Sequence, residues 1–249
     1  MKVATWNVNG IRARFEDVTA WSEAEAPDVF CLQEIKAAPS QVPEPLTGLP
    51  RYHNHWHGGA GGYSGVSLHL RRDTVGAGTI EVPDFDEEHR IVTARLTSGL
   101  VVASVYVHNG GKGGLEPKLR FLDHLRAWVA ARHADGDRVL VCGDLNVTRS
   151  DADLHPSHHK NGGLGQSKKE RAQLEAVLAE GVVDCLRHFT DDDSLFTWFP
   201  PWRNEKAKNH GWRIDYVLAS ESLVPKLERF DIQRDVGGSD HVPFVIELA

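Results

Sequence analysis

The stretch Val139-Leu140-Val141-Cys142-Gly143-Asp144-Leu145-Asn146 is an apolar run that leads directly into polar residues. In an extended chain, residues i and i+2 point to the same side, so Asp144 and Asn146 are expected to share a side. Gly143 lets the backbone bend sharply or approach a ligand closely. The stretch therefore predicts a buried strand with oxygen-bearing side chains at its carboxyl end.

Two earlier stretches repeat this arrangement. Val3–Trp6 runs into Asn7 and Asn9, and Val29–Leu32 leads to Glu34. Each piece alone is common turn chemistry and more typical of a turn than of a catalyst. Their recurrence at separate strand ends favours convergence on a hard, oxygen-liganded cation. Magnesium commonly takes one or two protein carboxylates, which suits Glu34 with help from Asp240.

The C-terminal half adds Trp212-Arg213-Ile214-Asp215-Tyr216 and Gly238-Ser239-Asp240-His241. Standing alone, the second stretch would be a turn with a surface imidazole, since the chain has 14 histidines. Beside the other clusters, His241 becomes a candidate phosphate contact that a carboxylate such as Asp215 orients.

Short apolar runs rich in branched residues alternate only partly with helical patterns, which predicts packed sheets flanked by helices in one domain, 1–249. The expected strands are Val3–Trp6, Val29–Leu32, Gly65–Leu70, Ile91–Leu96, Val101–Val107, Val139–Cys142, Ile214–Ala219 and Val242–Glu247. Three helices are expected, each with apolar residues along one face. These residues are Phe15, Val18 and Trp21 in the first helix, Leu119, Leu122, Leu125 and Val129 in the second, and Leu174, Val177 and Leu178 in the third. Ser167 and Glu170, at capping-box spacing, mark the start of the third helix. Segments 37–64, 108–116, 149–167 and 199–211 are predicted to be loops that carry binding groups.

Composition narrows the class of protein. The formal net charge of -7 argues against coating nucleic acid by bulk electrostatics, yet it is compatible with a carboxylate metal site and local basic loops. Cys31, Cys142 and Cys185 are predicted to be buried, reduced thiols. No apolar stretch approaches the roughly 20 residues needed to cross a bilayer, and the N-terminus lacks a secretory signal, so we expect a cytoplasmic protein without a membrane partner.

Six motifs occur in order from Trp6 to His241: W-N-V-N-G, L-Q-E-x-K, Y-V-x-N-G, C-G-D-L-N-V, W-R-I-D-Y and G-S-D-H. With these motifs the chain resembles the exonuclease III family of abasic-site endonucleases, within the broader endonuclease/exonuclease/phosphatase superfamily. The resemblance implies a four-layer α/β sandwich of the DNase I-like kind, with two packed mixed sheets, helices outside and a metal site at one sheet edge. It also implies a Mg²⁺-dependent DNA repair nuclease, with Mn²⁺ as a substitute ion.

The resemblance assigns roles position by position. Glu34 resembles the main magnesium ligand, and Asp240, Asn9 and Asn7 lie at the metal end. Asp144 resembles the residue that activates the attacking water, and Asn7 the group that positions Asp144. The implied clamp on the scissile phosphate comprises Asn146, Tyr106, Asn109 and His241, with Asp215 orienting His241.

Substrate selection is expected in the loops. The resemblance places Trp198, Trp212 and Ile214 in an apolar pocket for a flipped-out baseless sugar, which selects by size. Lys112 falls where relatives present a basic side chain to opened duplex DNA. Candidates for contacts with the DNA backbone are Arg12, Arg14, Lys36, Arg90, Lys160, Lys168 and Lys169. The expected partner is double-stranded DNA with abasic sites or blocked 3′ ends, bound by a monomer.

Some alternatives stay open. His108 stands where the family usually has proline, and Lys160-Asn161-Gly162-Gly163 matches the family loop only loosely. These two departures leave open the balance among abasic cleavage, 3′-exonuclease and 3′-end repair activities. The number of metal ions is also open. The competing hypotheses are a related phosphoesterase of the superfamily that acts on RNA or on a phosphorylated small molecule, and a catalytically silent DNA-binding module. His53, His55 and His57 look like metal ligands, but their predicted place in a Gly-rich loop without a Cys or carboxylate partner favours a structural or surface role.

Overall fold

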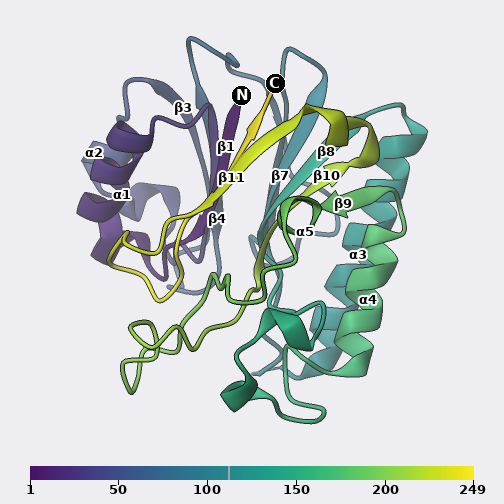
Figure 1. Cartoon of the computed structure of the whole chain (residues 1–249). Helices are drawn as coiled ribbons and strands as arrows, with labels where there is room; N and C mark the ends of the chain where they lie inside the picture. Colours follow the sequence, from purple (N-terminus) through teal and green to yellow (C-terminus); the bar gives the residue numbers. More distant parts are fainter. Residues whose placement is uncertain (112) are drawn as a thin grey trace.

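The computed structural model describes residues 1–111 and 113–249, which form two six-stranded mixed sheets that pack face to face (Figure 1). The order of the first sheet is β11 (Leu227–Ile232), β12 (Phe244–Leu248), β1 (Lys2–Asn7), β2 (Val29–Gln33), β4 (Val66–Arg71) and β3 (Tyr52–His57). The order of the second is β5 (Thr79–Glu81), β6 (Ile91–Arg95), β7 (Leu100–Tyr106), β8 (Arg138–Asp144), β10 (Asp215–Ser220) and β9 (Val182–Asp184).

Helices cover the outer face of each sheet (Figure 1). α1 (Ile11–Glu25) and α2 (Glu44–Thr47) pack on the first sheet, and α3 (Leu115–Ala134) and α4 (Lys168–Leu178) pack on the second. The short helix α5 (Cys185–Phe189) follows β9, and short 3-10 helices occur at Pro39–Gln41, Asp151–Asp153, Pro156–His158 and Glu221–Lys226. The predicted four-layer α/β sandwich is confirmed.

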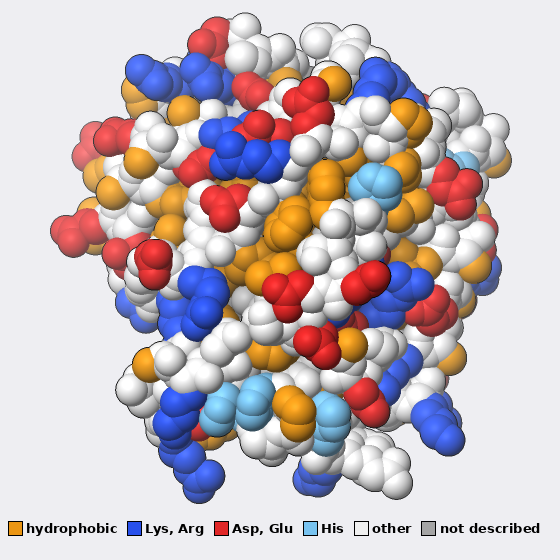
Figure 2. Space-filling model, in the orientation of Figure 1, with side chains coloured by type: hydrophobic (Ala, Val, Ile, Leu, Met, Phe, Trp, Pro, Cys, Tyr) orange, Lys and Arg blue, Asp and Glu red, His pale blue; other side chains and the backbone are white. Residues whose placement is uncertain are grey.

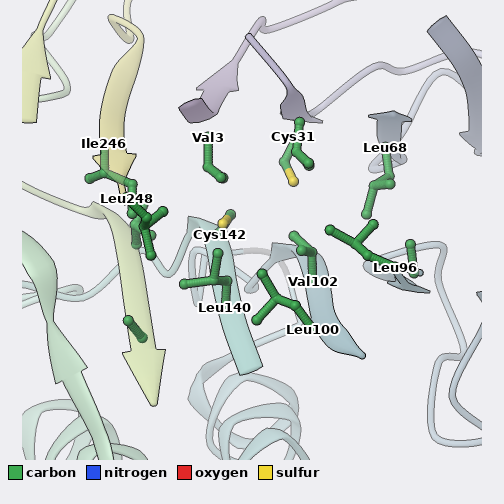
Figure 3. Close-up of a cluster of buried hydrophobic side chains, with 14 of the residues drawn as sticks. Val3, Cys31, Leu68, Leu96, Leu100, Val102, Leu140, Cys142, Ile246 and Leu248 are labelled. Atoms are coloured by element: carbon green, nitrogen blue, oxygen red, sulfur yellow. The ribbon is translucent and has the colours of Figure 1, made fainter. Parts of the chain in front are cut away.

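The main core lies between the two sheets (Figure 3). Val3, Cys31 and Leu68 from the first sheet face Leu140 and Cys142 from the second. Side chains along a strand alternate between its two faces. In β1, β2, β7 and β8, one face packs against the other sheet and the opposite face packs against helices, so both faces are buried. All three cysteines are free and buried, as predicted.

The predicted elements are present with small shifts of their ends. The three helical stripes belong to α1, α3 and α4, and the capping box at α4 is formed: the Ser167 hydroxyl accepts from the Glu170 N–H, and the Glu170 carboxylate accepts from the Ser167 N–H. Four strands, β3, β5, β9 and β11, were not predicted from the sequence. They are the edge strands of the two sheets and lack a continuous apolar run.

The prediction that 37–64 is only a loop is wrong, because His53, His55 and His57 lie on β3, an edge strand paired with β4. His57 bonds Asp86, and His53 contacts the guanidinium of Arg72. A nearby carboxylate partner therefore exists for His57, which the sequence did not reveal. Across the described ranges, none of the helices has the length and apolar character that crossing a bilayer requires.

Candidate active site

Strand direction explains why the polar strand ends meet. β1 and β2 run parallel, β7 and β8 run parallel, and β10 runs antiparallel to β8, so that Asp215 pairs with Asp144. β12 runs antiparallel to β1 and begins soon after His241, so its start meets the end of β1. Both chain termini lie at the opposite end of the sandwich (Figure 1).

At this edge lies a cavity of about 440 Å³. It is lined by Asn9, Glu34, Lys36, Asn109, Gly111, Asp144, Asn146, Leu164, Gly165, Trp198, Trp212, Ile214, Asp240 and His241. Polar strand ends thus share one cavity with three apolar side chains that the sequence assigned to a pocket.

Asn7 joins the two carboxylates at the centre of the site. Its amide nitrogen donates to Glu34 Oε1 and to Asp144 Oδ2, each at 2.9 Å. Asn7 itself is held by Ser239, whose hydroxyl donates to the Asn7 carbonyl at 2.8 Å. One amide group therefore fixes the positions of both carboxylates.

Asn146 holds Asp144 from the other side. The backbone N–H of Asn146 donates to Asp144 Oδ1 at 2.9 Å, and its side-chain amide donates to Asp144 Oδ2 at 3.1 Å. Asn146 has a φ of 53°, and Asn9, Glu34 and Lys36 also have positive φ. Such backbone conformations cost free energy in residues other than glycine and cluster at functional sites.

Gly143 is required by packing. A Cβ atom there would lie 1.8 Å from the carbonyl oxygen of Val105 on the neighbouring strand β7. The glycine therefore lets β8 approach β7 closely at the residue before Asp144.

His241 and Asp215 form a buried pair in which the imidazole Nδ1 lies 2.9 Å from Asp215 Oδ2. Burial acts to lower the pKa of His241, but the negative charge and hydrogen bond of Asp215 outweigh it, so the pKa of His241 is raised. Its Nε2 lies 3.8 Å from Asp144 Oδ2. Burial and the charge of Asp215 raise the pKa of Asp144 above its ordinary value.

Lys36 contacts the metal-ligand candidates. Its ammonium group lies 2.7 Å from Glu34 Oε2 and donates to Asn9 Oδ1 at 2.5 Å. Burial acts to raise the pKa of Glu34, but the hydrogen bonds from Asn7 and Lys36 outweigh it, so the pKa of Glu34 is lowered and its carboxylate is charged. Lys36, which the sequence ranked only as a candidate DNA-backbone contact, is thus part of the carboxylate network.

Three side chains converge closely enough to hold a cation. One ligand atom from each of Glu34, Asp144 and His241 lies within 4.8 Å of the others. Two of the three side chains offer carboxylate oxygens, the ligand type that suits a hard ion such as Mg²⁺. Asp240 is not in this group; its oxygens accept from Asn9 Nδ2 and Trp198 Nε1, each at 2.9 Å, and its role as a second ligand stays a prediction.

Tyr106 pairs with Asp144 across β7 and β8, and its ring lies 4.9 Å from the guanidinium of Arg90. Burial and the charges of Glu34 and Asp144 raise the pKa of Tyr106 well above its ordinary value, so its phenol stays protonated and can donate. Arg90 is 2% exposed and lies against both Tyr106 and Tyr63. Its prediction as a DNA-backbone contact is therefore wrong, because its guanidinium is packed inside the protein.

Trp198, Trp212 and Ile214 form the apolar wall of the cavity. The two indoles meet edge to face with centroids 5.8 Å apart, and their backbones form an antiparallel bridge. Ile214 is 5% exposed. Leu164, which is 49% exposed, and Gly165 complete this wall and were not identified from the sequence.

The remaining predicted residues lie at different distances from the site. Asn109 is exposed at the rim of the cavity, where its side-chain oxygen accepts from the Gly111 N–H at 2.9 Å. Arg12 is exposed on the first turn of α1 and is not among the lining residues. Lys112 lies outside the described residues.

Sequence reasoning also missed residues that support the site. The Thr197 hydroxyl accepts from the backbone N–H groups of Ile214 and Asp215, each at 3.1 Å. Lys118 and Glu170 form a fully buried ion pair, and Lys118 also donates to the Asn146 carbonyl at 2.7 Å. Only the unusual Lys on an otherwise apolar helical face signals this pair in the sequence.

Comparison with known proteins decides the family. The model of the endonuclease/exonuclease/phosphatase family matches residues 4–241. The chain belongs to this family. The predicted membership of the exonuclease III group is also confirmed by curated relatives of the family that carry the names exodeoxyribonuclease III and AP endonuclease.

Among the similar members of the family is a protein of Bacillus subtilis named exodeoxyribonuclease, which is 34% identical over 98% of this chain and 97% of its own length. The DNA repair nuclease APEX1 of Danio rerio is 34% identical over 100% of this chain and 82% of its own. Recombination repair protein 1 of Drosophila melanogaster is 36% identical, and the match covers 99% of this chain but only 37% of that protein.

The solved structure of an AP endonuclease from Archaeoglobus fulgidus has a TM-score of 0.86 at 26% identity and covers 100% of this chain and 99% of its own. A 3′-5′ exonuclease from Neisseria meningitidis shares the fold, with a TM-score of 0.90 at 24% identity. The match covers 100% of this chain and 99% of that chain.

Proposed function

We propose that this family member is a Mg²⁺-dependent DNA repair nuclease that cleaves the DNA backbone 5′ to abasic sites and also trims or cleans 3′ ends of duplex DNA. The observation that carries the proposal is the single cavity in which Glu34, Asp144 and His241 lie beside the wall of Trp198, Trp212 and Ile214. The names of the relatives, a DNA repair nuclease and exodeoxyribonucleases, support the same reaction and substrate class.

Glu34 is the residue that would hold the ion, because its carboxylate is charged and fixed by Asn7. Asn7, Asn9 and Asp240 support the metal end of the site. A bound Mg²⁺ would stabilise negative charge on the phosphate oxygens, and Mn²⁺ would serve as a substitute.

Asp144 accepts a proton from the attacking water. A general base works best when its pKa lies near the working pH, and burial beside Asp215 moves the pKa of Asp144 in that direction. Asn7 and Asn146 hold both of its oxygens, so the carboxylate keeps one orientation during the reaction.

In this proposal, hydrogen-bond donors around Asp144 stabilise the charge on the phosphate. Protonated His241, held by Asp215, presents its Nε2–H beside Asp144, while the Tyr106 phenol and the amides of Asn146 and Asn109 complete the clamp. One fixed donor in such a site typically contributes about 2.7–4 kcal/mol to lowering the barrier.

Selection of the lesion follows from the apolar wall. A deoxyribose without a base would lie in the active cavity against the wall of Trp198, Trp212 and Ile214, whereas a nucleotide that carries its base would be held away from this wall. Duplex DNA with abasic sites or blocked 3′ ends is thus the proposed partner, with Arg12 and Lys112 as backbone contacts. Action as a monomer in the cytoplasm is part of the same proposal.

The test is incision of a duplex with one tetrahydrofuran abasic analogue, with and without Mg²⁺. We expect metal-dependent cleavage 5′ to the analogue, its loss in Asp144→Asn, and no loss in the control Asp193→Asn, which changes an exposed carboxylate. Binding without incision would favour the silent DNA-binding module, and cleavage of RNA in preference to the abasic duplex would favour a different phosphoesterase.

A further inference from the structure

A second cavity of about 440 Å³ lies behind the apolar wall of the active site. Trp198 and Trp212 line both cavities, so their indoles form the partition between them. Histidine side chains gather at this lower end of the molecule (Figure 2), where Figure 1 places the loops that follow β8 and precede β10. Contacts that fix the two indoles from the side of the second cavity therefore also determine the shape of the active cavity.

The indole of Trp212 is held by a histidine. Its Nε1–H donates to the Nδ1 of His158 at 3.0 Å. An indole nitrogen can only donate, so His158 Nδ1 accepts and carries no proton. The proton of the neutral imidazole is then on Nε2, which lies 3.1 Å from Glu205 Oε2. A directed chain of hydrogen bonds thus runs from Trp212 through His158 to Glu205.

These hydrogen bonds join two loops that are far apart in the sequence. His158 lies in the loop after β8, and Glu205 and Trp212 both lie in the loop that precedes β10. Glu205 is anchored further, since its Oε2 lies 3.2 Å from His210 Nδ1. The side chains of His158 and Glu205 are only 17% and 9% exposed, so water is a poor substitute for either partner.

The opposite face of Trp212 has little space. A Cβ atom on Gly165 would lie 3.1 Å from Trp212 Cζ3. The indole is therefore packed against Gly165 in the active cavity and tied to His158 behind it. Loss of the rear bond would leave a mostly buried indole N–H without a partner and would favour other rotamers.

We infer that His158 is a positioning residue that fixes the Trp212 indole as the wall of the active cavity and so sets the discrimination between baseless and intact nucleotides. This inference rests on the proposed function. His158 is not among the residues that line the active cavity, so it acts through Trp212 and Glu205.

Three variants separate the contact from general structure. His158→Leu removes the acceptor at similar size, and His158→Asn restores it, because the amide oxygen takes the place of Nδ1. His159→Leu is the matched control: this neighbouring histidine is exposed and bonds the backbone carbonyls of Asp151 and Leu154. Thermal melting by circular dichroism checks that each variant folds.

The first readout is the indole N–H resonance of Trp212 in a ¹⁵N correlation spectrum of the free protein, assigned by its loss in Trp212→Phe. We expect the resonance to shift and its exchange with solvent to speed up in His158→Leu, to return toward the wild-type position in His158→Asn, and to stay unchanged in His159→Leu. An unshifted resonance in His158→Leu overturns the inference.

The second readout is the ratio of kcat/KM for an abasic duplex to kcat/KM for exonuclease action on an undamaged duplex. We expect this ratio to fall roughly three- to tenfold in His158→Leu, because that is the effect of losing one hydrogen bond. His158→Asn should restore the ratio. A shifted resonance with an unchanged ratio would also overturn the role in selection. Wild-type protein that incises no abasic duplex would instead refute the proposed function, while the resonance still decides whether His158 holds the indole.

Discussion

The Nδ1 of His241 and the Oδ2 of Asp215 lie 2.9 Å apart, with both side chains buried. The carboxylate opposes the effect of burial and raises the pKa of the imidazole, which stays charged beside Asp144. The Asp215→Asn variant removes that charge, so burial lowers the pKa of His241 and the donor becomes neutral at pH 7. We expect kcat for abasic-site incision to fall roughly 10²–10³-fold with KM little changed.

The measurement is steady-state kinetics at pH 6 to 9, with melting curves to show that the variant folds. Part of the lost activity should return at low pH, where His241 regains its proton. A kcat equal to that of the wild type across this range would show that the pair does not contribute to catalysis.

Removal of the Glu34 carboxylate should weaken metal binding. In Glu34→Gln the amide still accepts from Asn7 but no longer supplies a negative charge, so the Mg²⁺ concentration for half-maximal incision should rise at least about tenfold. A Mg²⁺ titration measures this, with Glu228→Gln as the control because Glu228 is exposed on β11. Identical titration curves for Glu34→Gln and the wild type would remove Glu34 from the metal site.

The buried pair of Lys118 and Glu170 should be visible in stability. Lys118→Met leaves the Glu170 carboxylate buried without its cation, and we expect the free energy of unfolding to fall by about 3–5 kcal/mol. The double variant Lys118→Met/Glu170→Gln should lose less, because no uncompensated charge remains. Urea denaturation measures both, and equal losses in the single and double variants would contradict the ionic interpretation.

His69 should make the protein sensitive to acid. This fully buried histidine stacks on Phe30 and bonds Ser67 and Asn54, and burial lowers its pKa to about 3. Between pH 6.5 and 3 the unfolded chain binds a proton at His69 that the folded chain does not. Stability attributable to this residue therefore falls as the pH falls, by up to about 1.4 kcal/mol per pH unit.

The His69→Gln variant cannot take up that proton, so its free energy of unfolding should depend less steeply on pH below 6.5. Urea denaturation at pH 4 to 8 compares the two proteins. Parallel curves for wild type and variant over this range would show that His69 is protonated in the folded state.

The sequence by itself determined the strands whose apolar runs are continuous, the three long helices and the polar residues that follow each strand. These are local properties: the apolar run from Val139 to Cys142 and the capping box of Ser167 and Glu170 are each formed by residues close together in the chain. The site residues Glu34, Asp144 and His241 were identifiable because residue type and order along the chain carry the family motifs.

Only the tertiary structure decided which of these groups touch. An edge strand such as β3 is held by hydrogen bonds to its partner strand and has no continuous apolar run of its own. Its residues were therefore predicted to form a loop. The contacts of Lys36 with Asn9, Lys118 with Glu170 and His158 with Trp212 join residues 27, 52 and 54 positions apart. Contacts of this kind depend on how the sheets and loops pack, and for that reason no local pattern of side chains predicts them.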